Sequence, residues 1–355
     1  MLTLIGALVL AKQAPVMLSR KFVKGEKLVY RYEGGVLQEE RQIGLLTMMP
    51  NTQDLKYTFT LDCLEERGNN VAIVRYRRPD LTVVLGETAE RGPKSETVKM
   101  DMDMNLTVSG ANDILDIKDN KPPKKDKPEK KDDGDGLKVT NFRFSKGAKV
   151  QGAVDAIAGQ FISELVFLSI FYGSFDSSLD FNPYLPFEPV APGATWKKTM
   201  GFQPQKVKGK KESQVQRFDA TFTYVGKDTF EKQAVNHVKA NLALDTDVAS
   251  FFNQQVGATA EQTGIKQLPL KFQAEVHFYL DATTGHTLYS EVNSKTTYKL
   301  WVVPFPNEPY EEGNIKGHAE LRLASRTVTG VKAPVKPTTK TTKTTKGKKG
   351  GKGGL

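Results

Sequence analysis

The sequence predicts a mainly β protein of the α+β class, built from two curved antiparallel β modules with one long amphipathic helix packed on a sheet. Three observations support this prediction. Apolar and polar residues alternate along many short runs, as in half-buried strands. One segment instead has the spacing of an amphipathic helix. The chain has 355 residues, enough for about two domains of 100–200 residues each.

These patterns divide the chain into four regions. We expect a signal segment and leader, a first β module, a second β module and a disordered basic tail, and the first module should contain a mobile Lys/Asp/Pro loop and the helix. The expected regions are 1–19, 20–185, 186–330 and 331–355, with the loop at 118–138 and the helix at 149–172.

The N-terminus carries an apolar run of ten residues, from Leu2 to Ala11. Such a run is typical of the hydrophobic part of a secretory signal, and predicts a secreted or periplasmic protein. No basic residue precedes it, so a buried strand in a cytoplasmic protein is the alternative. No apolar stretch approaches the roughly 20 residues that a membrane-spanning helix needs, and we therefore expect no transmembrane span.

Strand periodicity recurs along most of the chain. In residues 99–109, for example, one face is shared by Met100, Met102, Met104, Leu106 and Val108. Gly68–Asn70 and Thr283–Gly285 separate neighbouring runs, as hairpin turns do. The expected strands are 27–32, 55–64, 71–77, 99–109, 215–225, 235–244, 270–280, 286–300 and 318–327.

The two modules are suggested by a weak internal repeat with a period of about 165 residues. Tyr57–Leu61 resembles Ala220–Tyr224, and shorter matches occur before and after this pair in the same order. Antiparallel meanders produce some such matches by chance, so duplication and coincidence both remain open at this point.

The helix offers the first candidate binding site. Large apolar side chains crowd its C-terminal end, and its polar face carries almost no Lys or Arg, unlike helices that lie on anionic membranes. We expect it to pack on the sheet and to cover either a solid core or a pocket for an acyl chain. The candidate ligand-binding residues are Phe161, Leu165, Phe167, Leu168, Phe171 and Tyr172.

The tail offers the second candidate site. The net charge is +10, and the tail holds eight lysines and no acid, so the rest of the chain is close to neutral at +2. A flexible polycation binds polyanions by releasing counterions, but this tail has no aromatic residues to stack on bases. We expect an anionic cell-envelope polymer or lipid head group, rather than a specific nucleic acid, as its partner; a solubilising tail with no partner is the alternative. The candidate residues are Lys340, Lys343, Lys346, Lys348, Lys349 and Lys352.

No catalytic or metal-binding motif is found. The single cysteine, Cys63, lies in a strand run, where a buried apolar role is expected. The four histidines are scattered and form no pair at metal-ligand spacing. Common hydrolase and nucleotide-binding signatures are absent. We therefore predict no catalytic residues, no metal and no cofactor.

Three segments resemble a group of exported bacterial proteins of unknown function: Phe22–Tyr32, Pro189–Trp196 and Tyr279–Leu288. The resemblance covers most of residues 20–300 and rests on strand and turn signatures. It implies a curved antiparallel sheet with a covering helix, similar in style to the half-barrels of bacterial lipoprotein carriers. It implies no reaction, and it supplies no functional residues. The Lys-rich loop and tail depart from the group's pattern.

The functional hypothesis is therefore an exported, non-enzymatic envelope protein that binds an apolar or amphiphilic ligand, such as a lipid, between helix and sheet. One alternative is a structural or surface-interaction module that its Lys-rich tail tethers to polyanions. The other is an uncharacterised hydrolase, which would need several polar side chains to converge in one cleft.

Overall fold

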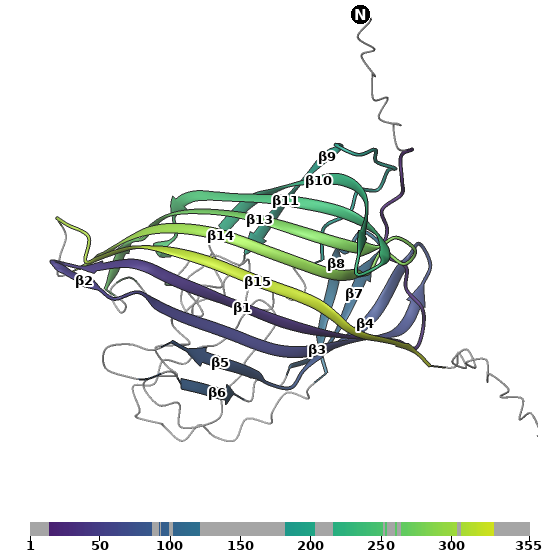
Figure 1. Ribbon diagram of the computed structural model, residues 1–355, viewed down its shortest axis with the longest axis horizontal. Helices are drawn as coiled ribbons and strands as arrows, with labels where there is room; N and C mark the ends of the chain where they lie inside the picture. Colours follow the sequence, from purple (N-terminus) through teal and green to yellow (C-terminus); the bar gives the residue numbers. More distant parts are fainter. Residues whose placement is uncertain are drawn as a thin grey trace, which may run out of the picture.

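The structure is a computed structural model, and it describes residues 14–86, 92, 94–98, 102–120, 182–202, 216–250, 253, 260, 264–303 and 307–329. These residues form one broad, bent antiparallel sheet (Figure 1). The first long strand and the last one lie side by side in its middle. This arrangement confirms the mainly β class and the antiparallel pairing predicted above.

The strands in chain order are β1 (Glu26–Ile43), β2 (Leu46–Met48), β3 (Asn51–Arg67), β4 (Val71–Arg78), β5 (Leu81–Leu85), β6 (Lys94–Val98), β7 (Met102–Ser109), β8 (Ile114–Asp119), β9 (Thr195–Phe202), β10 (Gln216–Phe230), β11 (Gln233–Asp247), β12 (Ile265–Gln267), β13 (Pro269–Asp281), β14 (Thr287–Val302) and β15 (Glu311–Val328). Their order across the sheet is β8-β7-β4-β3-β1-β15-β14-β13-β11-β10-β9. Off this path, β2 pairs with β1, β5 pairs with β3 and β6, and β12 pairs with β14.

All nine predicted strand runs coincide with strands, and residues 99–101 and 215 of these runs lie outside the described residues. Both predicted hairpin turns are also present. Asn69 and Asn70 have positive φ of 62° and 55° between β3 and β4, and Gly285 has φ of 70° between β13 and β14. Left-handed backbone of this kind is what Asn and Gly tolerate best.

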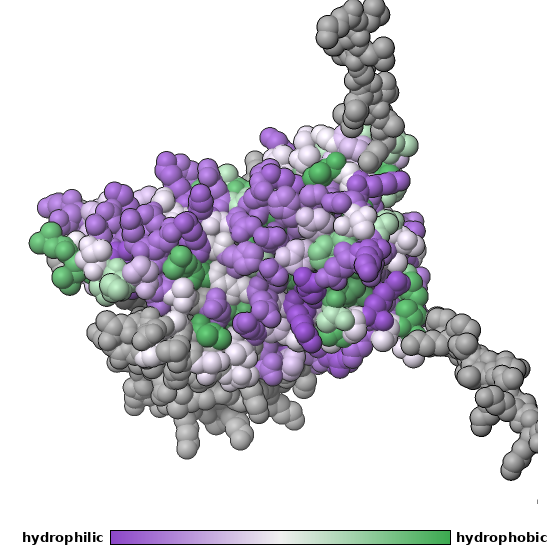
Figure 2. Space-filling view, viewed as in Figure 1, coloured by the Kyte–Doolittle hydropathy of each residue, from purple (hydrophilic) through white to green (hydrophobic). Residues whose placement is uncertain are grey.

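The two faces of the sheet differ in chemistry. On the apolar face, Tyr32 stacks on Tyr57 with ring centroids 4.5 Å apart, and Phe59 stacks on Tyr30 and Tyr76 at 5.1 and 5.2 Å. These rings meet because the strand register places Tyr32 opposite Tyr57 and Tyr30 opposite Phe59. The face in view in Figure 2 is mostly hydrophilic; we call it the polar face.

One end of the sheet, the capped end, is crossed by residues 14–25 and 182–190. The first segment bonds to three strand turns: Asn70 donates to Ser19 at 2.7 Å, and the amides of Arg20 and Lys21 donate to the carbonyls of Gly110 and Thr284, each at 2.8 Å. The second segment joins the two borders of the sheet. The Leu185 amide donates to the Ala111 carbonyl at 3.0 Å, and the Trp196 indole donates to the Tyr184 carbonyl at 2.8 Å.

The start of the predicted mobile loop is wrong. Lys118 and Asp119 belong to β8, where they pair with Asn105 and Met104 of β7. Backbone ladder bonds do not depend on side-chain polarity, so a polar run at a sheet border can continue a strand. The rest of the loop (121–138), the predicted helix (149–172) and the tail (331–355) lie outside the described residues.

Strands of both predicted modules share this one sheet, joined by the pairing of β1 with β15. The module boundary at residue 185 and the duplication stay predictions. Of the predicted leader, the structure describes residues 14–19, and Leu18 is buried there. Within the described residues, no helix has the length and apolar character needed to cross a membrane.

Candidate functional site

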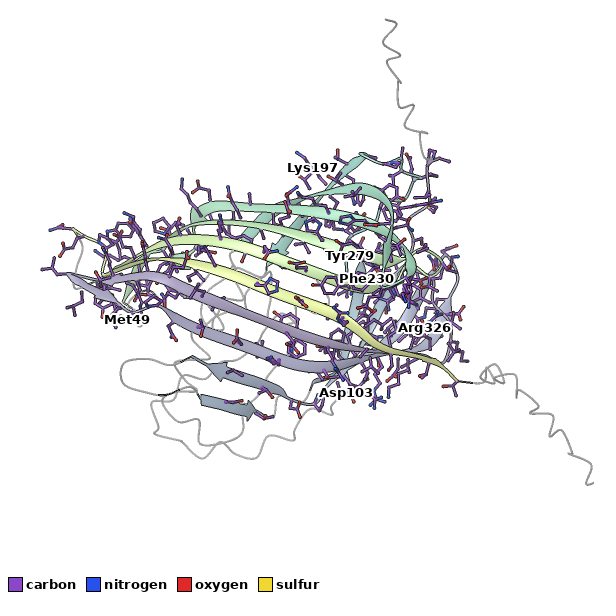
Figure 3. All side chains as sticks on the ribbon, in the orientation of Figure 1. Met49, Asp103, Lys197, Phe230, Tyr279 and Arg326 are labelled. Atoms are coloured by element: carbon purple, nitrogen blue, oxygen red, sulfur yellow. The ribbon has the colours of Figure 1, made fainter. Side chains whose placement is uncertain are left out.

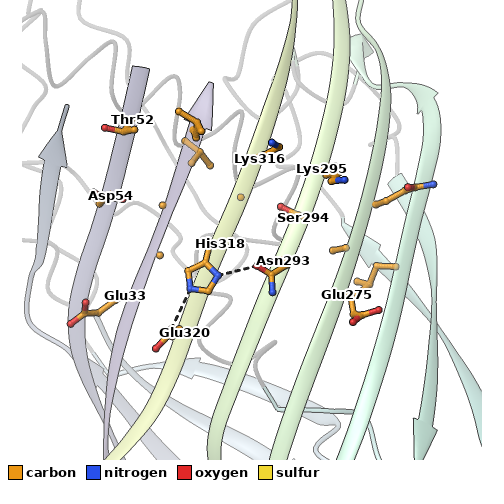
Figure 4. Close-up of a pocket in the computed structure, with 18 of the residues that line it drawn as sticks. Glu33, Thr52, Asp54, Glu275, Asn293, Ser294, Lys295, Lys316, His318 and Glu320 are labelled. Carbon is orange, nitrogen blue, oxygen red and sulfur yellow. Dashed lines mark hydrogen bonds and ion pairs between the residues drawn. The ribbon is translucent and has the colours of Figure 1, made fainter. Parts of the chain in front are cut away.

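A groove on the polar face has a volume of about 1300 Å³ (Figure 4). It crosses the middle of the sheet. Seven neighbouring strands contribute to it, in the order β3, β1, β15, β14, β13, β11 and β10. The groove residues used below are Glu33, Gly35, Leu37, Asp54, Lys56, Asn293, Lys295, Lys316, His318 and Glu320.

Strand register brings these residues together from distant parts of the sequence. Gly35 of β1 lies opposite Asp54 of β3 on one side and opposite His318 of β15 on the other. His318 in turn lies opposite Asn293 of β14. Because side chains alternate between faces, all of these positions belong to the polar face.

The middle of the groove is open because glycines there have no side chains to fill it. Gly34, Gly35 and Gly317 line it together with Val36 and Ala274. Val36 and Ala274 are buried, because side-chain alternation places their side chains on the apolar face, so these two residues offer backbone to the groove. Leu37, which is 36% exposed, adds an apolar surface at one side. The groove therefore has apolar and backbone surface along its floor.

Charged pairs of both signs stand around this floor. Lys56 lies 3.0 Å from Glu33, and Lys316 lies 2.5 Å from Glu39 of the neighbouring hollow. The His318 ring lies between two partners, with Nδ1 3.1 Å from the Asn293 amide oxygen and Nε2 3.3 Å from Glu320. Figure 4 shows this ring in the centre of the groove.

A second group of polar side chains lies at the β13 side of the groove. Glu275 contacts the Lys239 ammonium, and its other oxygen lies 2.8 Å from Nε2 of His277. These two partners hold the pKa of Glu275 below its usual value. His277 also lies 2.9 Å from His237, whose pKa is lowered by burial and by the neighbouring imidazole.

A smaller hollow of about 540 Å³ continues the groove along β1, β14 and β15. It shares Leu37, Lys295 and Lys316 with the groove. Pro50, in the connection between β2 and β3, also lines it. The two hollows thus form one path from the middle of the sheet towards the end opposite the capped end.

This arrangement is suited to binding through hydrogen bonds, ion pairs and apolar contact. Among the described residues, no group of three or more His, Cys, Asp or Glu side chains is placed to hold a metal ion. Cys63 lies outside the groove and is buried, and burial raises the pKa of its thiol to about 11. A thiol with so high a pKa is a poor nucleophile, in agreement with the structural role predicted for it.

A separate buried ionic cluster lies at the capped end. Glu26 is 2% exposed and lies 2.9 Å from His286 and 2.6 Å from Arg326. Burial alone would raise the pKa of Glu26, but these two partners outweigh it and hold the pKa below its usual value. Burial lowers the pKa of His286, and the nearby Arg20 guanidinium lowers it further.

The sequence-predicted sites are not among these residues. The apolar residues of the predicted helix and the lysines of the tail all lie outside the described part of the chain. His318, Asn293 and the pair of His237 with His277 were not predicted as site residues, because the partners are 25 and 40 positions apart in the sequence. Correct strand register was the one signal that would have found them.

Comparisons with known proteins identify no family. No protein-family model matches the chain, and no curated protein matches it. A solved structure on lipid–protein interactions in lipovitellin is similar at 10% identity and a TM-score of 0.42, covering 88% of this chain. An outer membrane channel from Pseudomonas putida F1 is similar at 7% identity and a TM-score of 0.21, covering 88% of this chain and all of the channel chain.

The chain spans only 26% of the length of the lipovitellin chain that it matches. Because both TM-scores are below 0.5, neither likeness supports a function. The described residues form a β-rich antiparallel fold, and the surfaces of this fold carry the functional argument.

Proposed function

We propose that this is an exported, non-enzymatic binding protein that holds an amphiphilic molecule in the groove of the polar face. The observation that carries the proposal is the combination of an apolar and backbone floor with charged pairs of both signs around it. An amphiphile presents these same two kinds of surface.

The size of the groove supports this class of ligand. Binding sites for small molecules commonly have volumes of about 300–1,000 Å³. The groove and the smaller hollow together have room for an elongated molecule, with about 1300 and 540 Å³ respectively. Leu37 belongs to both hollows and offers apolar contact where they meet.

The charges support a zwitterionic or neutral polar group rather than a bare anion. Lysines 56 and 316 are already paired with carboxylates, and carboxylates of Asp54 and Glu320 also line the groove. An anionic ligand would be repelled by these acids. A group with both signs of charge, or with hydroxyls, finds partners for each part.

Binding rather than catalysis fits the arrangement around His318. Its two ring nitrogens face an amide oxygen and a carboxylate. Its side chain is 52% exposed, so the dry environment that strengthens catalytic electrostatics is missing. Polyanion binding by the Lys-rich tail stays a separate prediction.

Fluorescence anisotropy of a dye-labelled lysophosphatidylcholine, titrated with the full chain below the lipid's micellar concentration, tests the proposal. Asn293→Trp fills the groove with a large ring and should weaken binding about tenfold or more. Thr58→Trp places the same ring at an exposed position of β3 that does not line the groove, and should leave binding unchanged. Equal affinities for the two variants would refute the groove as the site.

A further inference from the structure

The end of the sheet opposite the capped end carries an exposed group of apolar side chains, the apolar tip. Leu45 is fully exposed, Leu46 is 67% exposed and Met49 is 74% exposed. Figure 2 shows hydrophobic side chains gathered at this end, and Figure 3 places Met49 there, far from Arg326 at the capped end. The apolar tip consists of Leu45, Leu46, Met48, Met49, Val303 and Tyr310.

The local structure holds these side chains in the solvent at defined positions of a hairpin. Ile43 of β1 pairs with Leu46 of β2, so Gly44 and Leu45 form a two-residue turn, with Gly44 at φ of 58°. Such turns usually carry Asn, Asp or Gly. A leucine at the outermost point of a hairpin gains nothing from folding, because it stays in water in the folded protein.

The connection between β14 and β15 lies at the same end and bonds to the β1–β2 turn. The Gly44 amide donates to the Tyr310 carbonyl at 3.1 Å, and the Tyr310 amide donates to the Leu300 carbonyl at 2.8 Å. Behind the tip, Arg41 makes two bonds to Glu311, of 2.7 and 3.0 Å, and the Tyr298 hydroxyl donates to Glu311 at 2.7 Å. Backbone and side-chain hydrogen bonds therefore fix the two connections that carry the apolar tip.

We propose that the apolar tip docks the protein onto a neutral or zwitterionic lipid surface. Leucine and methionine side chains would enter the boundary between head groups and acyl chains, with Tyr310 near the head groups, where amphipathic rings are favoured. Exposed apolar residues scattered singly need no explanation, but a contiguous group at a projecting end marks an interaction site.

The charge around the tip decides which surface fits. Residues 38–50 and 299–312 hold five acids and only two basic residues. An anionic membrane would repel this end, whereas a neutral one would not. A second copy of the chain is also disfavoured, because two such tips would repel each other and a stable dimer needs about 20–30 residues a side.

Docking by the tip is distinct from ligand binding in the groove, because no residue of the tip lines the groove or the smaller hollow. The tip variants described next do not touch the groove, so soluble lysophosphatidylcholine should still bind to them. The groove variant Asn293→Trp should in turn still bind vesicles. The two proposals can therefore fail separately.

Flotation of the full chain with phosphatidylcholine vesicles tests the proposal. The double variant Leu45→Asp, Leu46→Asp should lower the vesicle-bound fraction about tenfold or more. The matched control Leu115→Asp changes another exposed leucine, on β8, and should bind as the parent chain does. Neutral vesicles also exclude binding through the lysine tail.

Three results would overturn the proposal. These are flotation of the double variant like the parent chain, an equal loss of binding by the Leu115→Asp control, and binding of the parent chain to phosphatidylglycerol vesicles only, in a salt-sensitive manner. Sedimentation gives a fourth: a parent dimer that the double variant dissociates, without vesicle binding, would assign the tip to self-association.

Discussion

The two ends of this sheet use the same kinds of turn for opposite purposes. At the capped end, three turns are covered by residues 14–25, and titratable groups such as Glu26 and His286 are buried against partners. At the apolar tip, a glycine turn supports leucines that remain in water. The difference teaches that stability is concentrated at one end, whereas the other end is free to serve an interaction.

Substitutions of leucine should show the largest difference between the two ends. Leu185 is fully buried at the capped end, whereas Leu45 is fully exposed at the tip. Leu185→Ala should lower the free energy of unfolding by about 2–5 kcal/mol, because it leaves a cavity. Leu45→Ala should change it by less than about 0.5 kcal/mol. Urea unfolding measures both values. Similar losses of unfolding free energy would show that Leu45 also stabilises the fold.

Glycine gives a second, smaller contrast. Gly285 and Gly44 have similar positive φ of 70° and 58°. A Cβ on Gly285 would lie 2.2 Å from the Ser19 carbonyl oxygen, whereas one on Gly44 meets nothing within 4 Å. Both alanine variants share the cost of left-handed backbone. Gly285→Ala should lose about 1–3 kcal/mol more in thermal or urea unfolding, since backbone must also move. Equal losses would mean that the cap yields easily.

The ionic cluster makes stability at the capped end depend on pH. The pKa of His286 is lowered in the folded chain, so the unfolded chain binds its proton more readily. Stability from His286 is therefore complete above the unfolded pKa of about 6.5 and is lost as pH falls below it. Stability from Glu26, whose pKa is also lowered, is lost only at lower pH, below about 4.5.

His286→Gln should flatten the slope of unfolding free energy between pH 7 and 5, by at most about 1.4 kcal/mol per pH unit. Urea unfolding at several pH values measures this slope. His318→Gln serves as the control, because that imidazole is half exposed and far from Glu26 along the sheet. A parent chain with no slope in this range would contradict the assignment.

How much the sequence could reveal follows from what each kind of structure depends on. Alternation predicted that Met104, Leu106 and Val108 share a buried face, because two-residue periodicity is local. It missed β8 and β6, whose lysines and acids obscure that periodicity. It also missed the groove, because Asn293 and His318 meet only through strand register, and the same composition at another register would place no histidine beside an amide.

The pairing of β1 with β15 has a consequence for synthesis. Glu26 bonds to Arg326, 300 positions later. While the chain emerges from the ribosome, the edge of β1 that pairs with β15 therefore stays unpaired until β15 has been made. Unpaired borders of this kind favour aggregation, and distant pairing slows folding, so the nascent protein should depend on a holding chaperone.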